Sequence, residues 1–266
     1  MTTFNNVTYH KDTNNVVTVT MNRPDKHNAF NDEMIAELQG CFVRVNQDPE
    51  ARAMVLASNG KSFCAGADLN WMQRMAEYSY EQNKQDAEKL AALFEMLYHL
   101  RVPSIARVQG SAFGGAIGLI ACCDMAIASK LSKFCLSEVK IGLVPATISP
   151  YVVEALGPRV AKRYFMTAEV FSSRRARRLG LISEVVNEES LDETIDDLVK
   201  HILANGPRAV AQAKELVEEV AYKPITGDLI DSTSELIARI RVSEEGQEGL
   251  QAFLQKRSPN WREDNA

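Results

Sequence analysis

The sequence contains few residues of the kinds that bind metals or build disulfide frameworks. Its 266 residues include four histidines and five cysteines, and none of these has the spacing of a metal-binding motif. The cysteine count is odd, two cysteines are adjacent, and most lie in apolar runs. We therefore expect no metal site and reduced, buried thiols, as in a cytoplasmic protein.

Long apolar runs and a strong excess of charge are also missing. The longest apolar run, Ala116–Cys123, is far too short to span a bilayer, and the polar start Met1–Asn6 lacks the basic and apolar regions of a secretory signal. The net charge is −5 and the pI is about 5.5, which argues against nucleic-acid binding. The chain has no Walker loop and no dinucleotide fingerprint. We therefore expect no membrane partner, no nucleic-acid partner and no nucleotide redox cofactor.

What the sequence does contain is the pattern of a layered α/β protein. Val16–Met21 alternates apolar and polar residues, as a half-buried strand does. The continuous apolar runs Ala53–Ala57 and Ser104–Gln109 fit strands that are buried on both faces. A glycine turn follows each of these runs, and a helical pattern comes later, at residues 82–100 and Ala116–Cys122. This recurrence predicts an α/β fold of ββα units that wind in one direction.

The pattern becomes helical in the last part of the chain. From Pro158 onward most of the apolar residues recur at helical spacing, and the change of character is marked near residues 187–206. We therefore expect an α/β core at residues 1–200 and a helical region at residues 201–266. The apolar faces of the predicted tail helices are broad enough to suit packing against a neighbouring subunit.

Two glycine-bearing turns stand out after apolar runs, at Phe63–Asp68 and Phe113–Gly118. Glycine lets the backbone approach a ligand closely, and each turn can leave an N–H group free. Two such N–H groups aimed at one point would form an oxyanion hole, suited to a thioester enolate or to a tetrahedral oxyanion. Taken alone, the turns are better explained as close-packing points in a tightly wound sheet.

Glu138 follows a short predicted strand and precedes an apolar segment. A carboxyl group in such surroundings can have a raised pKa and act as a general acid and base. Taken alone, a solvent-facing loop glutamate is the simpler interpretation. Trp71, Met72 and Met75 could line an apolar pocket or belong to the core, and the residues leave both options open.

Taken in order, these features resemble the crotonase (enoyl-CoA hydratase/isomerase) superfamily. The resemblance covers nearly the whole chain, and its specificity comes from the order and spacing of the pieces, which are Asn22-Arg23-Pro24, Asn28-Ala29, Phe63–Leu69, Gly110–Gly115, Cys123-Asp124 and Glu138. The residues within these motifs resemble those of the bacterial methylglutaconyl-CoA hydratase group, which serves leucine breakdown, and of the related carboxygeranoyl-CoA hydratase group. Both lie within fatty acid metabolism in the broad sense.

The resemblance implies a spiral of ββα units followed by a helical trimerisation region, in a homotrimer or a hexamer built as a dimer of trimers. The substrate would be an acyl-CoA thioester, and coenzyme A would enter only as part of that substrate. The oxyanion hole would use the N–H groups of Ala67 and Gly115, with Glu138 as acid and base. The implied contacts to CoA are Lys26, His27, Ala65, Asp68, Leu69, Phe253 and Lys256.

One departure from the family pattern concerns the reaction. Hydratases of the two-glutamate type would carry their first glutamate at Gly118 and their second at Glu138. Three enzymatic readings follow: hydration or dehydration with Glu138 alone, a Δ3–Δ2 double-bond shift that needs one base, or loss of ordinary hydratase activity. A water molecule or a carboxylate of the substrate are conceivable replacements for the missing acid.

The resemblance favours an enoyl-CoA hydratase, a lyase, for a branched or dicarboxylic acyl group, with the isomerase as the alternative. A second carboxylate on the substrate calls for a cation, and Arg74 is a candidate, although an exposed residue is the better interpretation of it. A third hypothesis keeps the fold as a non-catalytic interaction or RNA-binding module, which would have no reason to keep Glu138 or a cleft for CoA.

Overall fold

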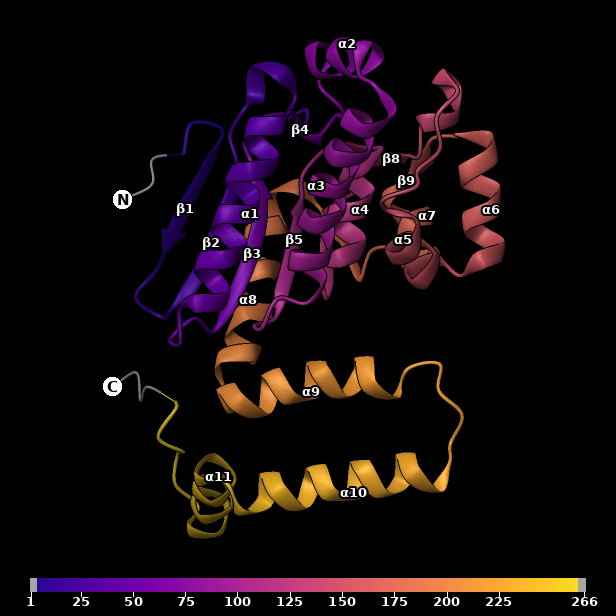
Figure 1. Cartoon of the computed structure of the whole chain (residues 1–266). Helices are drawn as coiled ribbons and strands as arrows, with labels where there is room; N and C mark the ends of the chain where they lie inside the picture. The colour runs from indigo at the N-terminus through magenta and orange to yellow at the C-terminus, as the bar shows by residue number, and fades with distance from the viewer. Residues whose placement is uncertain (1–3, 263–266) are drawn as a thin grey trace. The chain divides into compact units, whose positions relative to one another are not determined.

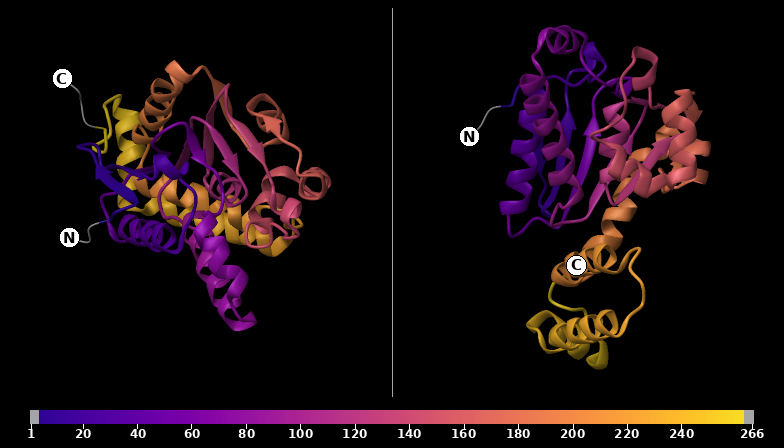
Figure 2. Two further views of the ribbon diagram at one scale, coloured as in Figure 1. Left: turned by 90° about the horizontal axis from the view of Figure 1, so that it is seen from above. Right: turned by 45° about the vertical axis from the view of Figure 1, so that its right-hand side comes forward.

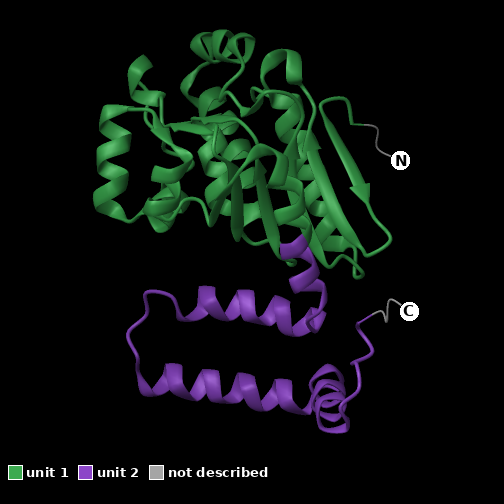
Figure 3. Ribbon diagram, turned by 180° about the vertical axis from the view of Figure 1, so that it is seen from behind, with its two compact units in different colours: residues 1–196 green, residues 197–266 purple. Residues whose placement is uncertain are grey.

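The computed structural model describes residues 4–262, and the chain forms two compact units (Figure 3). The first unit comprises Met1–Asp196 and the second Asp197–Ala266. The division falls inside helix α8 (Leu191–Leu203), whereas the sequence places it between residues 200 and 201. Each unit is described by itself.

The first unit contains a six-stranded sheet in which every neighbouring pair of strands but one is parallel. Strand β1 pairs with β2 in the antiparallel direction, and all later neighbours are parallel. All six residues of β3 are buried, as the continuous apolar run predicts. In spatial order the strands are β1 (Val7–Lys11), β2 (Val16–Met21), β3 (Ala53–Ser58), β5 (Ser104–Val108), β7 (Met125–Ser129) and β10 (Glu184–Val186).

A second, four-stranded sheet takes up the strands that are missing from the first. Its spatial order is β4 (Ser62–Cys64), β6 (Ser111–Phe113), β8 (Lys133–Cys135) and β9 (Phe171–Ser172). Strands β3 and β4, β5 and β6, and β7 and β8 are therefore consecutive pairs that place one strand in each sheet. Helices follow each pair. This arrangement is the predicted α/β spiral of ββα units.

Helices α1 (Asp32–Gln47) and α3 (Tyr80–Tyr98) lie side by side along one face of the six-stranded sheet (Figures 1 and 2). The Asn31 side chain accepts a hydrogen bond from the Met34 N–H and so begins α1, as the sequence indicates. An apolar stripe of α1 is buried, including Leu38 and Phe42. Burial of this stripe, rather than helix propensity, stabilises the helix on the sheet.

The other helices of the first unit are short. Helix α4 is buried on every side, which explains its apolar composition. These helices are α2 (Leu69–Glu77), α4 (Gly115–Cys122), α5 (Ser149–Leu156), α6 (Pro158–Thr167) and α7 (Ser173–Leu179), and the 3₁₀ turns are η1 (Pro24–Lys26), η2 (Glu138–Ile141) and η3 (Glu188–Ser190).

The second unit is helical, as expected. It contains α9 (Pro207–Val220), α10 (Gly227–Val242) and α11 (Glu244–Gln255) after the end of α8. Apolar side chains on these helices are exposed, among them Ile237, Leu250 and Leu254. Within residues 4–262, none of the helices has both the length and the apolar character that crossing a membrane requires.

Candidate active site

The candidate site begins where three parallel strands end side by side. Strand β6 pairs with β4 on one side and with β8 on the other, parallel to both. The carboxyl ends of parallel strands meet at one edge of a sheet, and ligands of α/β proteins commonly bind at that edge. The turn that carries Ala67 follows β4, Gly115 follows β6, and Glu138 follows β8. The topology thus brings together the three residues predicted to be catalytic.

The two glycine turns touch each other and the acid. A methyl group built on Gly66 would lie 3.2 Å from the Phe113 carbonyl oxygen. A methyl group built on Gly114 would lie 3.9 Å from Cα of Gly66 and 3.4 Å from Oε1 of Glu138. Gly66 has φ of +97° and Gly114 has φ of +56°, a region that glycine adopts without strain. The two turns are therefore closely packed against each other, and the same packing places them beside Glu138, where a ligand could bind.

The N–H groups of Ala67 and Gly115 are not used by the fold. Neither donates a hydrogen bond within the described part of the chain, residues 4–262. Around Ala67, the Phe30 N–H donates to the Gly66 carbonyl and the Asp68 N–H donates to the Phe30 carbonyl, both at 2.7 Å. Gly115 is the first residue of α4, where N–H groups have no intrahelical partner and carry partial positive charge. Two donors are thus available on neighbouring turns.

Glu138 opens the 3₁₀ turn η2, and its carboxyl group is largely withdrawn from solvent. Its Oε2 atom is buried and has no hydrogen-bond partner among residues 4–262. Burial disfavours the charged form and raises the pKa of Glu138 above its usual value. A solvent-facing loop glutamate does not describe this side chain. A carboxyl group with a raised pKa beside two unused donors can move protons at a centre that gains negative charge.

Five of the residues predicted to contact CoA lie around one backbone hydrogen bond. The Ala65 N–H donates to the His27 carbonyl at 3.0 Å, which joins the loop after β2 to the turn after β4. Lys26, His27, Ala65 and Leu69 are exposed there, with Leu69 at 76%. The ring nitrogen Nδ1 of His27 lies 3.2 Å from the hydroxyl of Ser62. These residues form one continuous exposed rim beside the glycine turns.

The fifth of these residues, Asp68, differs because its side chain is already engaged. Asp68 is buried and begins α2, accepting hydrogen bonds from the N–H groups of Asn70 and Trp71. It also forms an ion pair with Arg23, with Nη2 and Oδ2 3.1 Å apart. Burial alone would raise the pKa of Asp68, but the hydrogen bonds from Trp71 and Arg23 outweigh it and hold the pKa below its usual value. Its main chain is engaged as well, because the Asp68 N–H donates to the Phe30 carbonyl and the Asp68 carbonyl accepts from the Met72 N–H. The contact of Asp68 with CoA stays a prediction.

Three residues that shape the site were not predicted to do so. Arg23 holds Asp68, and the fully buried Asn28 donates from Nδ2 to the carbonyls of Asn59 and Ser62. Phe30 bonds to the first glycine turn, and its ring lies 3.2 Å from the place of a methyl group on Gly115. Buried polar groups need hydrogen-bond partners. The polar residues that precede Phe30 were therefore the one sign in the sequence that this loop makes structural hydrogen bonds.

Gly118, where a second acid is expected, is packed against apolar side chains. A methyl group on Gly118 would lie 2.2 Å from Cγ2 of Ile148 and 2.9 Å from Cε1 of Phe94. Ile148 is 1% exposed and immediately precedes α5. Arg74, the candidate partner of a substrate carboxylate, forms an exposed ion pair with Asp32 at 2.6 Å. Its side chain is therefore engaged in the free protein.

Comparison with known proteins decides the family. The family described as "Enoyl-CoA hydratase/isomerase" matches residues 11–264. The chain belongs to this family. It is an enzyme of the crotonase superfamily, so the hypothesis of a non-catalytic module is set aside, and its α/β spiral is the fold of its structural relatives.

Curated relatives of this crotonase-family enzyme include proteins named as hydratases and a protein named as an isomerase. It is 31% identical to the crotonyl-CoA hydratase of Syntrophomonas wolfei over 243 residues, covering 91% of this chain and 92% of the relative. It is also 31% identical to the 1,2-epoxyphenylacetyl-CoA isomerase of Escherichia coli over 254 residues, covering 92% and 94%. A crystal structure of an enoyl-CoA hydratase from Shewanella pealeana is similar with a TM-score of 0.94 and 45% identity, covering 97% of this chain and 96% of that one.

The last two residues predicted to contact CoA belong to the second unit. Phe253 lies on α11 and is 81% exposed, and Lys256 ends that helix in the left-handed conformation with an exposed side chain. Both are open to a ligand or to another subunit. Their contact with CoA stays a prediction.

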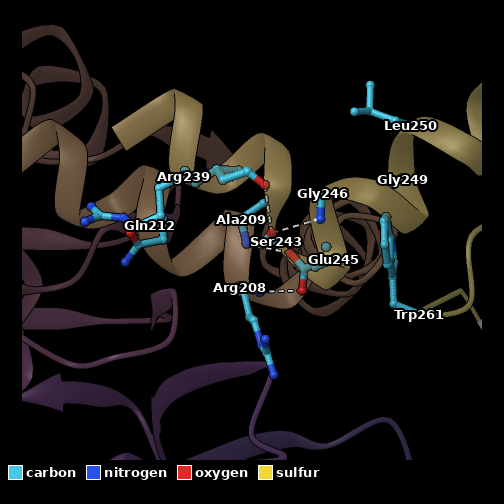
Figure 4. A pocket seen from close by; sticks show the side chains of 12 residues that line it. Arg208, Ala209, Gln212, Arg239, Ser243, Glu245, Gly246, Gly249, Leu250 and Trp261 are labelled. Atoms are coloured by element: carbon cyan, nitrogen blue, oxygen red, sulfur yellow. Dashed lines mark hydrogen bonds between the residues drawn. The ribbon is translucent and has the colours of Figure 1, made fainter. Parts of the chain in front are cut away.

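The second unit also contains a cavity of about 400 Å³ between its helices (Figure 4). Glu245 accepts hydrogen bonds from the N–H groups of Arg208 and Ala209, which have no partner inside α9, and so joins α11 to the start of α9. Trp261 covers the side near Gly249. None of the predicted site residues lines this cavity. Across residues 4–262, no group of three or more histidine, cysteine or acidic side chains is placed to hold a metal ion.

Proposed function

We propose that this enzyme adds water to the double bond of an enoyl-CoA thioester, or removes it in the reverse direction. The thioester oxygen binds between the N–H groups of Ala67 and Gly115. Glu138 is the general acid and base. CoA follows the rim formed by Lys26, His27, Ala65, Asp68 and Leu69, and Phe253 and Lys256 contribute from the tail helices of a neighbouring subunit, with coenzyme A as part of the substrate and no separate cofactor.

The proposed reaction uses one carboxyl group twice. Ionised Glu138 takes a proton from water while the water oxygen forms a bond to the β-carbon. The electron pair of the double bond moves toward the carbonyl group and gives an enolate, whose oxygen gains charge and accepts hydrogen bonds from both N–H groups. Glu138 then returns its proton to the α-carbon. Atoms and charges balance, and both additions occur on the face that Glu138 occupies.

One observation carries the proposal: a buried carboxyl oxygen without a partner lies next to two backbone donors without partners. Leaving such a group unpaired in the folded state costs about 1–3 kcal/mol. The fold supplies no hydrogen bond to Oε2 of Glu138 within residues 4–262, whereas a substrate or an attacking water would supply one. A structural glutamate would be paired or exposed.

For the acyl group, we propose a branched or dicarboxylic chain such as 3-methylglutaconyl-CoA. The wording of the motifs around the two glycine turns supports this choice, as does similarity to a relative named (E)-benzylidenesuccinyl-CoA hydratase from Thauera aromatica, at 31% identity over 253 residues. Because Asp32 engages Arg74, Arg74 is not included in the proposed acyl site.

The test replaces Glu138 with glutamine and follows the loss of enoyl-thioester absorbance. Crotonyl-CoA and 3-methylglutaconyl-CoA serve as substrates, and Glu184→Gln, an exposed residue on β10, is the control. Loss of a positioned general acid and base lowers kcat by about 10²–10⁴. Turnover of E138Q within threefold of the unaltered enzyme on every substrate would reject the proposal. A higher kcat/KM on crotonyl-CoA than on 3-methylglutaconyl-CoA would reject the proposed acyl preference alone.

An isomerase is the second candidate, and the packing at Gly118 favours it. A Δ3–Δ2 double-bond shift needs one base, which takes a proton from C2 and returns it to C4 while the dienolate is held. The filled position at Gly118 does not hinder this reaction. Conversion of a 3-enoyl-CoA to its 2-enoyl isomer, faster than hydration of that isomer, would establish it. Clear hydration without this conversion would exclude it.

We also propose that the enzyme assembles as a homotrimer or as a dimer of trimers. Support comes from apolar side chains that the second unit leaves exposed, including Ile237, Leu250 and Leu254, at 45%, 47% and 77%. Exposed apolar surface of this extent is typical of a subunit interface. Light scattering after size-exclusion chromatography distinguishes a monomer, which contradicts the proposal, from three or six copies of the 29.6 kDa chain.

A further inference from the structure

The position of Ile148 next to Gly118 is fixed by the surrounding structure. Its carbonyl accepts a hydrogen bond from the Val152 N–H at 3.0 Å, which fixes its main chain at the start of α5. Phe94 of α3 lies on the same side of Gly118. The ring of Phe94 is itself 6.2 Å, centroid to centroid, from that of Tyr151 on α5. Two helices therefore support the apolar side chains that close this position.

The point that a Cβ atom of residue 118 would occupy is also closed to a water molecule. A methyl carbon on Gly118 would overlap Cγ2 of Ile148, at 2.2 Å. An oxygen atom at the same point would overlap too, because contacts between non-bonded carbon and oxygen atoms are normally well above 3 Å. The three atoms nearest to this point are carbons of Ile148 and Phe94, which cannot hydrogen-bond a water. While Ile148 is in place, this position can hold neither the side chain of a second acid nor a bound water.

We propose that Ile148 determines which chemistry the site performs. By filling the volume beside Gly118, it keeps a second acid and its water out of the site and leaves Glu138 to transfer every proton. This inference rests on the proposed function, and Ile148 is a specificity-determining residue within it. Residues 118 and 148 then form a pair, because a larger side chain at position 118 requires a smaller one at position 148.

A single proton-transferring group changes the balance between the two reactions. In hydration, Glu138 must take the proton of water and return a proton to the α-carbon in succession. With two acids, one carboxylate takes the proton of water while the other delivers its own proton to the α-carbon. The double-bond shift uses one group in either case. Opening the position and adding a carboxylate should therefore accelerate hydration more than isomerisation.

The packing half of the proposal is tested with small substitutions that the chain can tolerate. Gly118→Ala should lower Tm in the presence of Ile148, and the loss should shrink by at least half in the Ile148→Ala background, with the contact to Phe94 accounting for the remainder. The control background is Val152→Ala, a buried residue of α5 that is not among the nearest neighbours of Gly118. Equal losses of Tm in the Ile148→Ala and Val152→Ala backgrounds would overturn the pairing.

The chemical half is tested by comparing Gly118→Glu/Ile148→Ala with Gly118→Gln/Ile148→Ala. The two side chains have nearly the same size, and only one is an acid. We expect the variant with glutamate to hydrate crotonyl-CoA at least tenfold faster than the variant with glutamine and to show one more titrating group in its pH–rate profile. The two variants should differ less in the rate at which they isomerise a 3-enoyl-CoA. Equal hydration rates and identical pH profiles would overturn the role of Ile148.

The two halves also separate this inference from the proposed function. If the unaltered enzyme converts neither 2-enoyl-CoA nor 3-enoyl-CoA substrates, the proposed function fails, and the reaction-determining role of Ile148 fails with it. The dependence of Tm on residues 118 and 148 is measured without substrate, so its result does not depend on the proposed function. If the unaltered enzyme is active and the variants with glutamate and glutamine behave alike, only the inference about Ile148 fails.

Discussion

Arg23 and Asp68 form a largely buried ion pair that joins the loop after β2 to the first turn of α2. Their side chains are 16% and 8% exposed, and Arg23 also donates from Nη1 to the Ala29 carbonyl at 2.6 Å. Because Asp68 directly follows Ala67, the pair holds the chain next to a proposed oxyanion donor. Arg23 therefore acts on the site through Asp68.

Replacement of Arg23 by methionine should destabilise the protein strongly. The change leaves the Asp68 carboxylate buried without its cation, which typically costs about 3–5 kcal/mol. The control is Arg74→Met, which breaks an exposed pair with Asp32 and should cost at most about 1 kcal/mol. Urea unfolding at pH 7 measures both. Similar losses of unfolding free energy in the two variants would show that the Arg23–Asp68 pair contributes no more to stability than an exposed pair.

The same pair gives a pH dependence whose sign can be worked out. The pKa of Asp68 is below its usual value in the folded protein, so the ionised form stabilises the fold above the unfolded pKa, and this contribution is lost as the pH falls. Asp68→Asn should therefore lose stability relative to the unaltered enzyme at pH 7 and approach it at low pH. A difference that stays constant with pH would contradict this assignment.

Glu138 should show the opposite dependence. Its folded pKa is raised above the usual value of 4.5, so the folded protein holds the proton more tightly, and stability is lost as the pH rises through the folded pKa. Glu138→Gln removes this cost. We expect E138Q to melt above the unaltered enzyme at pH 8 and the difference to vanish near pH 4. Calorimetry at both pH values measures it, and a variant that melts lower at pH 8 would disprove the prediction.

Gly66→Ala should impair catalysis more than its strain alone explains. A left-handed alanine costs about 1–2 kcal/mol, and here the methyl group would also press on the Phe113 carbonyl. Displacing the neighbouring N–H of Ala67 should lower kcat by about 10²–10³, as for loss of one oxyanion donor. Gly157→Ala is the control, since it has φ of +74° and no neighbour within 4 Å. Equal kcat values for the two variants would argue against an oxyanion hole at this turn.

The five cysteines should be unreactive in the native protein. All are buried thiols outside any disulfide, and burial raises the pKa of Cys41 and Cys64 to about 12. Because the thiolate is the reactive form, we expect almost no reaction with an aromatic disulfide reagent at pH 8 and five equivalents after unfolding. A rapid native titration of one or more thiols would contradict this.

Local patterns predicted most of the fold. The run Ala53–Ala57 and the alternation at Val16–Met21 identify β3 and β2 because strand burial is visible in consecutive residues. Strands β1, β4, β6, β9 and β10 were not predicted, and all of these except β1 have only two or three residues, too few to show a periodicity. The contact between Gly118 and Ile148 could not be predicted either, since it joins elements that are far apart in sequence. The two glycine turns were identified because glycine itself is the signal.

Phe30 bonds through its main chain to the first glycine turn and packs through its ring against the second. One side chain, 2% exposed, thus acts as a rigid spacer between the two proposed donors. A displacement of Phe30 would therefore reach both turns at once. A buried side chain that contacts both turns would help to hold the proposed oxyanion hole together before substrate arrives, so that less binding energy is needed to assemble it.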